Sequence, residues 1–222
     1  MVRSNSYFTL MASLPALPAH FEVERVPITQ PRLAYRLRML EPDDYGVVRE
    51  LSNFLVWDRQ RRDRTDEEMI AEYRRLTATL TNPMALHIVN FRMDVRTIMS
   101  GLRRRRRGMA PPAGLGRWVE VIRRNWNQHL FGLGNIHPWI AEVEPLLKTT
   151  DCLAAERILL GVSWREWRRL GGEHHFSFEA VLLYLARWEI VNRWTGLDAE
   201  TGRNRFGELV TESLGEYANL YE

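Results

Sequence analysis

Apolar residues between positions 83 and 108 recur every three or four residues, which predicts one long amphipathic helix. The apolar seam of this helix consists of Ile88, Phe91, Val95, Ile98 and Leu102. Three polar residues fall off the seam, namely Asn90, Asp94 and Arg96. Five consecutive arginines, Arg103 to Arg107, then close the helix. We therefore expect a buried helix with a cationic end.

The same period returns along the rest of the chain, interrupted by capping and stop signals. Thr65 and Glu68 form a capping box, Asn82-Pro83 starts the long helix, and Asp151 is an N-cap. The expected helices cover residues 7–14, 31–40, 42–62, 66–80, 83–108, 115–131, 138–148, 151–171, 178–194 and 202–220. Strand-like alternation is sustained nowhere in the sequence, so we predict an all-α protein.

The stretch from Gly108 to Gly116 is the clearest linker, because it combines Pro111 and Pro112 with several glycines. It divides the chain into an N-terminal helical lobe (1–108), a linker (109–116) and a C-terminal helical lobe (117–222). One continuous domain is the alternative, since 222 residues suit either arrangement.

Charge and cysteine content narrow the class of protein. The chain has 31 basic and 28 acidic residues, for a net charge of only +3, which favours a mixed-charge helical surface over a strongly cationic nucleic-acid binder. No apolar run is long enough to cross a bilayer, and the N-terminal residues 1–19 contain Pro15 and Pro18, which argues against a signal peptide. The single cysteine, Cys152, lies in an apolar stretch and is expected in the core. We expect a cytoplasmic protein.

The sequence carries no recognisable catalytic motif, and we predict neither a catalytic residue, a metal site nor a cofactor. His174 and His175 are adjacent, but no HxxxH or HxxE pattern supplies further ligands. The candidate binding residues are Arg103, Arg104, Arg105, Arg106 and Arg107. Five clustered guanidiniums repel one another, which favours an acidic partner. Three interpretations of the run stay open: a solvated helix face, a surface that binds a protein, and a surface that binds phosphate groups.

Two stretches of the chain resemble the C-type central-stalk subunit of V/A-type ATPases, an all-helical protein with a counterpart in the eukaryotic enzymes. The stretch from His87 to Gly108 is similar to a helix of that family with an Asn-rich start and a Leu-Arg ending before a glycine. A second stretch follows a Tyr…Glu-x-x-Asn-x-Arg-like pattern with the last spacing one residue short, through Tyr184, Glu189, Asn192 and Arg193. The opening segment 7–17 is similar to the start of an uncharacterised bacterial family that is encoded beside V-type ATPase genes.

The resemblance implies a non-catalytic coupler between the rotor shaft and the membrane ring of a bacterial V/A-type ATPase. Its partners would be those rotor subunits, without a small-molecule substrate, and it would be cytoplasmic and peripheral to the inner membrane only through the complex. The C-type stalk protein has three related helical lobes, whereas 222 residues suffice for about two, so a shortened component is implied.

Two other classes stay open. A free-standing basic helical adaptor or nucleic-acid-associated protein is motivated by the arginines, although aromatic residues do not interleave with them. An enzyme with dispersed acids, such as Asp43, Asp44 and Glu173, has only the presence of carboxylates in its favour.

Overall fold

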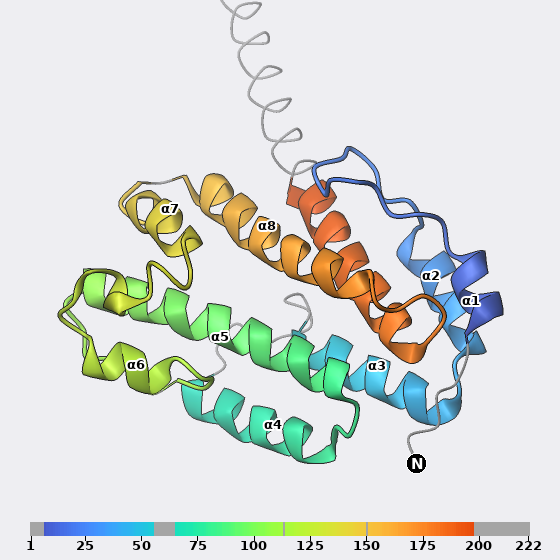
Figure 1. Ribbon diagram of the computed structural model, residues 1–222, viewed down its shortest axis with the longest axis horizontal. Helices are drawn as coiled ribbons and strands as arrows, with labels where there is room; N and C mark the ends of the chain where they lie inside the picture. The colour runs from blue at the N-terminus through green and yellow to red at the C-terminus, as the bar shows by residue number, and fades with distance from the viewer. Residues whose placement is uncertain (1–6, 56–64, 113, 150, 198–222) are drawn as a thin grey trace, which may run out of the picture.

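The computed structural model describes residues 7–55, 65–112, 114–149 and 151–197, and within these ranges it contains helices and no strand (Figure 1). In chain order the helices are α1 (Phe8–Ser13), α2 (Gln30–Arg36), η1 (Leu37–Met39), α3 (Pro42–Leu55), α4 (Asp66–Thr79), α5 (Pro83–Arg106), α6 (Val119–Arg124), η3 (His129–Gly132), α7 (Trp139–Leu146) and α8 (Cys152–Gly171). A further helix covers residues 178–197. The prediction of an all-α protein is confirmed.

Local capping signals begin three of the helices, α4, α5 and α8, where the sequence predicts them. The Thr65 side chain accepts a hydrogen bond from the backbone N–H of Glu68, and the Glu68 carboxylate accepts one from the Thr65 N–H. Asn82 Oδ1 accepts from two backbone N–H groups of the first turn of α5, and Asp151 accepts from one in α8. These bonds satisfy donors that have no partner within the helix, so each start is determined locally.

Two predictions differ from the structure. The helix expected over 115–131 is wrong, because α6 spans only Val119–Arg124 and the chain around it lies against α5 instead. Cys152 is exposed at the first position of α8, so the expectation of a core cysteine is also wrong. The expected helical residues 56–62 and 202–220 lie outside the described residues.

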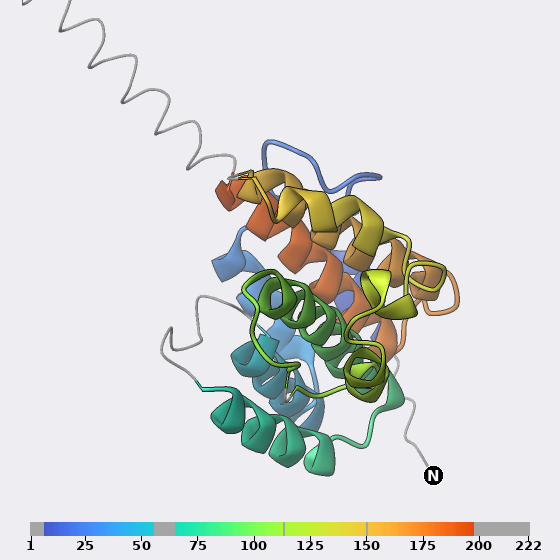
Figure 2. The ribbon, with the colours of Figure 1, turned by 90° about the vertical axis from the view of Figure 1, so that its left-hand side faces the viewer.

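Helix α5 runs through the middle of the molecule (Figures 1 and 2). It packs against α3 and α6, while α8 lies antiparallel to it on the opposite side. Its buried positions include much of the predicted seam, with Ile88, Ile98 and Leu102 each less than 5% exposed. None of the described helices combines the length and the apolar character that a membrane span requires.

The buried side chains form two hydrophobic clusters that do not follow the predicted lobes. The larger cluster joins α1 to α4 and the first half of α5 with the end of α8 and the helix 178–197. The smaller cluster joins the second half of α5 with α6, η3, α7 and the start of α8. Residues from both predicted lobes, 1–108 and 117–222, therefore share one core.

The N-terminal coil between α1 and α2 lies against the helix 178–197 (Figure 1). The Trp188 indole N–H donates to the backbone carbonyl of Ile28, and the Tyr184 hydroxyl donates to that of Pro15, both at 2.9 Å. Burial raises the pKa of Tyr184 to about 12, so its hydroxyl keeps the proton that it donates. The two ends of the described chain are thereby joined.

Candidate functional site

The predicted arginine run ends the central helix. The buried seam stops at Leu102, and Arg103 to Arg106 form the last turn of α5, where cations complement the negative end of the helix dipole. The turn is closed by a Schellman motif: the Met109 N–H donates to the carbonyl of Arg104, and Gly108 adopts a φ of 66°. A residue with a side chain is strained at this φ, which accounts for the glycine.

The five arginines are not equivalent. The Arg104 Nε donates to the backbone carbonyl of Ala110 at 2.8 Å, and the Arg105 guanidinium donates to that of Gln128 at 2.7 Å. The Arg105 guanidinium also lies over the Phe131 ring, 4.5 Å from its centroid. Arg104 therefore binds the segment directly after α5, and Arg105 binds the segment between α6 and η3.

The remaining three, Arg103, Arg106 and Arg107, are exposed. Within the described residues their side chains make no hydrogen bond or ion pair. They are the part of the predicted binding run that is available to a partner, and sequence reasoning did not separate them from the other two.

The surface next to the arginines is held in place by a strained turn. Leu130 and Phe131 adopt left-handed φ angles of 49° and 58°, a conformation that costs roughly 1–2 kcal/mol per residue. Both side chains are buried, and Phe131 stacks on Trp126 with 5.4 Å between ring centroids. Gly101 of α5 allows this approach, since a Cβ there would lie 3.2 Å from the Phe131 ring. Burial of the two large side chains stabilises the turn against its strain.

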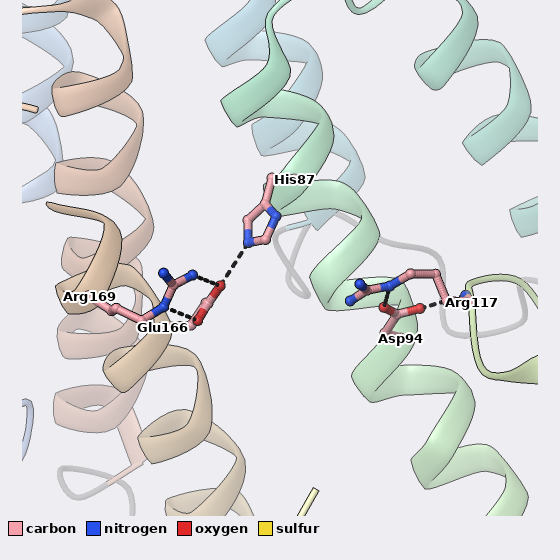
Figure 3. A network of polar contacts seen from close by, with 5 residues as sticks. All are labelled: His87, Asp94, Arg117, Glu166 and Arg169. Atoms are coloured by element: carbon pink, nitrogen blue, oxygen red, sulfur yellow. Dashed lines mark hydrogen bonds and ion pairs between the residues drawn. The ribbon is translucent and has the colours of Figure 1, made fainter. Parts of the chain in front are cut away.

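The middle of α5 is held by a buried carboxylate (Figure 3). Asp94 was expected off the apolar seam, but it is only 3% exposed, because the segment after the predicted linker covers it. Its two oxygens accept hydrogen bonds from the backbone N–H and from the Nε of Arg117, both at 2.8 Å. Such charge-assisted bonds to a buried carboxylate are among the stronger polar contacts in proteins.

The predicted linker is packed against this part of α5. The Thr97 hydroxyl donates to the carbonyl of Leu115, and Gly116 lies so close to Asp94 that a Cβ there would be 2.4 Å from its Oδ1. Gly116 also has a φ of 102°, which favours glycine. The contacts of residues 114–117 therefore hold the segment that leads into α6 against α5.

A histidine and a tryptophan border this buried acid. Burial lowers the pKa of His137, Asp94 opposes this shift, and Arg117 adds to it. The His137 ring meets the Trp118 indole edge-on, with 4.9 Å between centroids. Among the described side chains, Trp118 Nε1 and His137 Nε2 are buried without a hydrogen-bond partner.

The first turns of α5 are joined to the end of α8 by a second polar network (Figure 3). Glu166 accepts two hydrogen bonds from Arg169, at 3.1 and 2.9 Å, and its Oε1 lies 2.9 Å from His87 Nε2. The hydrogen bonds from Arg169 lower the pKa of Glu166, burial opposes this shift, and the contact with His87 adds to it. Helix α5 is thus held near its start, at its middle and at its end.

The acids and histidines considered as candidate chemistry have local roles or are spread over the surface. Asp43 and Asp44 occupy the first turn of α3, and Asp44 accepts a hydrogen bond from the Tyr7 hydroxyl. Glu173 and His175 are exposed in the turn after α8, where His174 is half-buried. Where the structure is described, no three His, Cys, Asp or Glu side chains are grouped to hold a metal ion.

Fold and site together define an all-α protein whose central helix ends in exposed arginines. Residues 39–214 match the model of a family described as "Protein of unknown function (DUF2764)", and the chain belongs to this family. The comparison with curated proteins and that with solved structures gave no match.

Proposed function

We propose that the chain is a non-catalytic component of a bacterial V/A-type ATPase, acting as a central-stalk coupler between the rotor shaft and the membrane ring. In this role it supports ATP-linked ion transport and lies in the cytoplasm, peripheral to the inner membrane through the complex. The observation that carries the proposal is the position of the two stretches that resemble the C-type stalk protein. Residues 87–106 of the first stretch form most of α5, and residues 184–194 lie in the helix 178–197. Both contribute to the same core.

The construction of α5 suits a mechanical role. A coupler transmits torque only if its helices resist sliding past one another, and close packing with fixed polar contacts provides this resistance. The Glu166 network, the Asp94 contact and the Phe131 turn hold α5 at three levels. The exposed Arg103, Arg106 and Arg107 then project from a fixed helix end, where an acidic surface of a rotor component could bind them.

The test is co-purification of the tagged full-length chain from cells that contain the ATPase. We expect the catalytic-head and rotor-shaft proteins of the ATPase to be recovered with it, identified by mass spectrometry. The triple variant R103Q/R106Q/R107Q is expected to recover less of them, because it removes the exposed cations.

The matched control is R25Q/R74Q/R75Q, which removes the same charge from exposed arginines elsewhere. Recovery of the chain without any of these ATPase proteins would refute the proposal. Equal losses in both triple variants would show that net charge, and not the end of α5, matters.

The exposed arginines also favour a second candidate, a free-standing adaptor that binds nucleic acid. In that case a labelled duplex or single strand should bind at low salt, and affinity should fall steeply as salt is added. The R103Q/R106Q/R107Q variant should reduce the salt dependence. Absence of binding at low salt would exclude this candidate.

A further inference from the structure

A cavity of about 320 Å³ lies between the α2–η1 segment, α3, α5, α8 and the helix 178–197. Its volume is at the lower end of the range of small-molecule sites, roughly 300–1,000 Å³. Most of the wall is apolar and includes Leu33, Leu37, Leu51, Trp167 and Leu182. This composition suits a ligand with an apolar body.

The polar part of the wall comes mainly from the two stretches that resemble the C-type stalk protein. Arg92 belongs to the first stretch, and Glu189, Asn192 and Arg193 belong to the second. Arg193 is paired with Glu156 of α8. Within the described residues, however, Arg92 makes no hydrogen bond or ion pair.

The half-buried Arg92 lines this cavity, so its guanidinium is available to an acceptor that a ligand supplies. Burial lowers the pKa of Arg92, Arg193 lowers it further, and Glu156 and Glu189 oppose both. The side chain remains protonated, because the pKa of arginine lies far above neutrality. The two oxygens of a carboxylate placed against it would accept hydrogen bonds from the guanidinium in a bidentate geometry.

The surrounding charges limit the charge of the ligand. Two arginines, Arg92 and Arg193, share this region with two glutamates, Glu156 and Glu189. A phosphate or a dicarboxylate would bring a second negative charge toward Glu189, whereas a single carboxylate can be matched by Arg92 alone.

We propose that this cavity binds a small aliphatic monocarboxylate, with its chain against the apolar wall and its carboxylate on Arg92. This proposal does not depend on the proposed coupling function. It concerns a ligand that is bound and not chemically changed. It differs from the sequence-based expectation, which contained no small molecule.

The test uses octanoate as the probe with the full-length chain, by isothermal titration calorimetry and by the shift of the unfolding temperature. We expect octanoate to bind and 1-octanol, which has the same chain without the charge, to bind more weakly. The R92Q variant is expected to bind octanoate at least about tenfold more weakly, as follows from losing a hydrogen-bonded charge pair. The R75Q variant, changed at an exposed arginine of α4, should bind like the wild type.

A second variant covers the case in which R92Q does not fold. The substitution S52F fills the cavity from α3 without changing a charge and is expected to abolish octanoate binding. Undiminished binding by either folded variant would overturn the proposal, as would equal binding of octanol. Absence of octanoate binding by the wild type would overturn it too.

Discussion

Two separate features require a glycine at position 116: its backbone conformation and its contact with Asp94. Its φ of 102° disfavours any other residue, and the space that a Cβ would need is occupied by Asp94. Asp94 in turn depends on this approach for its hydrogen bond from the next residue, Arg117. The sequence around Gly116 is typical of a flexible linker, but this glycine is needed for close packing against Asp94.

We expect Gly116→Ala to lower the free energy of unfolding by about 2–4 kcal/mol, from left-handed strain together with overpacking against Asp94. Urea denaturation followed by tryptophan fluorescence measures this change. Gly46→Ala is the matched control, because nothing lies within 4 Å of its added Cβ in α3. The control should gain roughly 0.5–1 kcal/mol, since alanine favours a helix interior. A neutral Gly116→Ala would contradict the close contact.

Glu166 gives the protein an acid-sensitive contact. Its pKa is depressed in the folded state, chiefly by the hydrogen bonds from Arg169. A carboxylate of this kind contributes stability that is fully present above its unfolded pKa, about 4.3, and is lost as the pH falls through the folded value.

We therefore expect Glu166→Gln to be less stable than the wild type at neutral pH and to lose less stability on acidification below about pH 4.3. Urea unfolding at a series of pH values provides the measurement. Glu142→Gln, at an exposed position of α7, serves as the control and should keep the wild-type pH dependence. Parallel curves for Glu166→Gln and the wild type would contradict this role.

At the scale of elements, the junction between α5 and α6 is held by side chains of α5. Thr97 donates to the Leu115 carbonyl, and Asp94 accepts from Arg117. The segment 109–116 is thus attached to the helix that precedes it, although its prolines and glycines are typical of a linker. The described residues of this segment form no helix, as its composition predicts, but composition did not predict their hydrogen bonds to α5.

We expect Thr97→Val to increase amide hydrogen exchange in residues 114–118, because the Leu115 carbonyl loses its donor. The stability loss should be about 1 kcal/mol, the usual net value of one hydrogen bond. Thr79→Val removes a comparable bond within α4, to the Leu76 carbonyl, and should leave exchange at 114–118 unchanged. Identical exchange in the two variants would argue against the attachment.

At the scale of the whole molecule, the core is shared between distant parts of the chain. The larger hydrophobic cluster contains residues before Met93 and residues after Leu160. The N-terminal coil is also hydrogen-bonded to Tyr184 and Trp188. The N-terminal part consequently buries its apolar surface on the last described helix.

We predict that the fragment 1–108 does not fold cooperatively by itself, because it lacks the part of the larger cluster that α8 and the helix 178–197 supply. Near-ultraviolet circular dichroism and urea unfolding of the fragment provide the measurement, with the full-length chain as reference. Mixing it with the fragment 109–222 should restore part of the signal. A cooperative transition of 1–108 alone would instead support two independent lobes.

The sequence by itself determined where α4, α5 and α8 begin, because capping depends on neighbours two or three residues away. Thr65, Asn82 and Asp151 were predicted correctly for this reason. The apolar period likewise determined most of the buried face of α5.

Only the tertiary structure decided which polar residues are covered and which are available. Asp94 is buried by a residue 23 positions away, Arg105 is bound to a carbonyl 23 positions away, and Arg92 lies in a cavity formed by distant helices. Contacts over such separations depend on how the helices pack, and the period of one helix does not encode the neighbour that its polar residues meet.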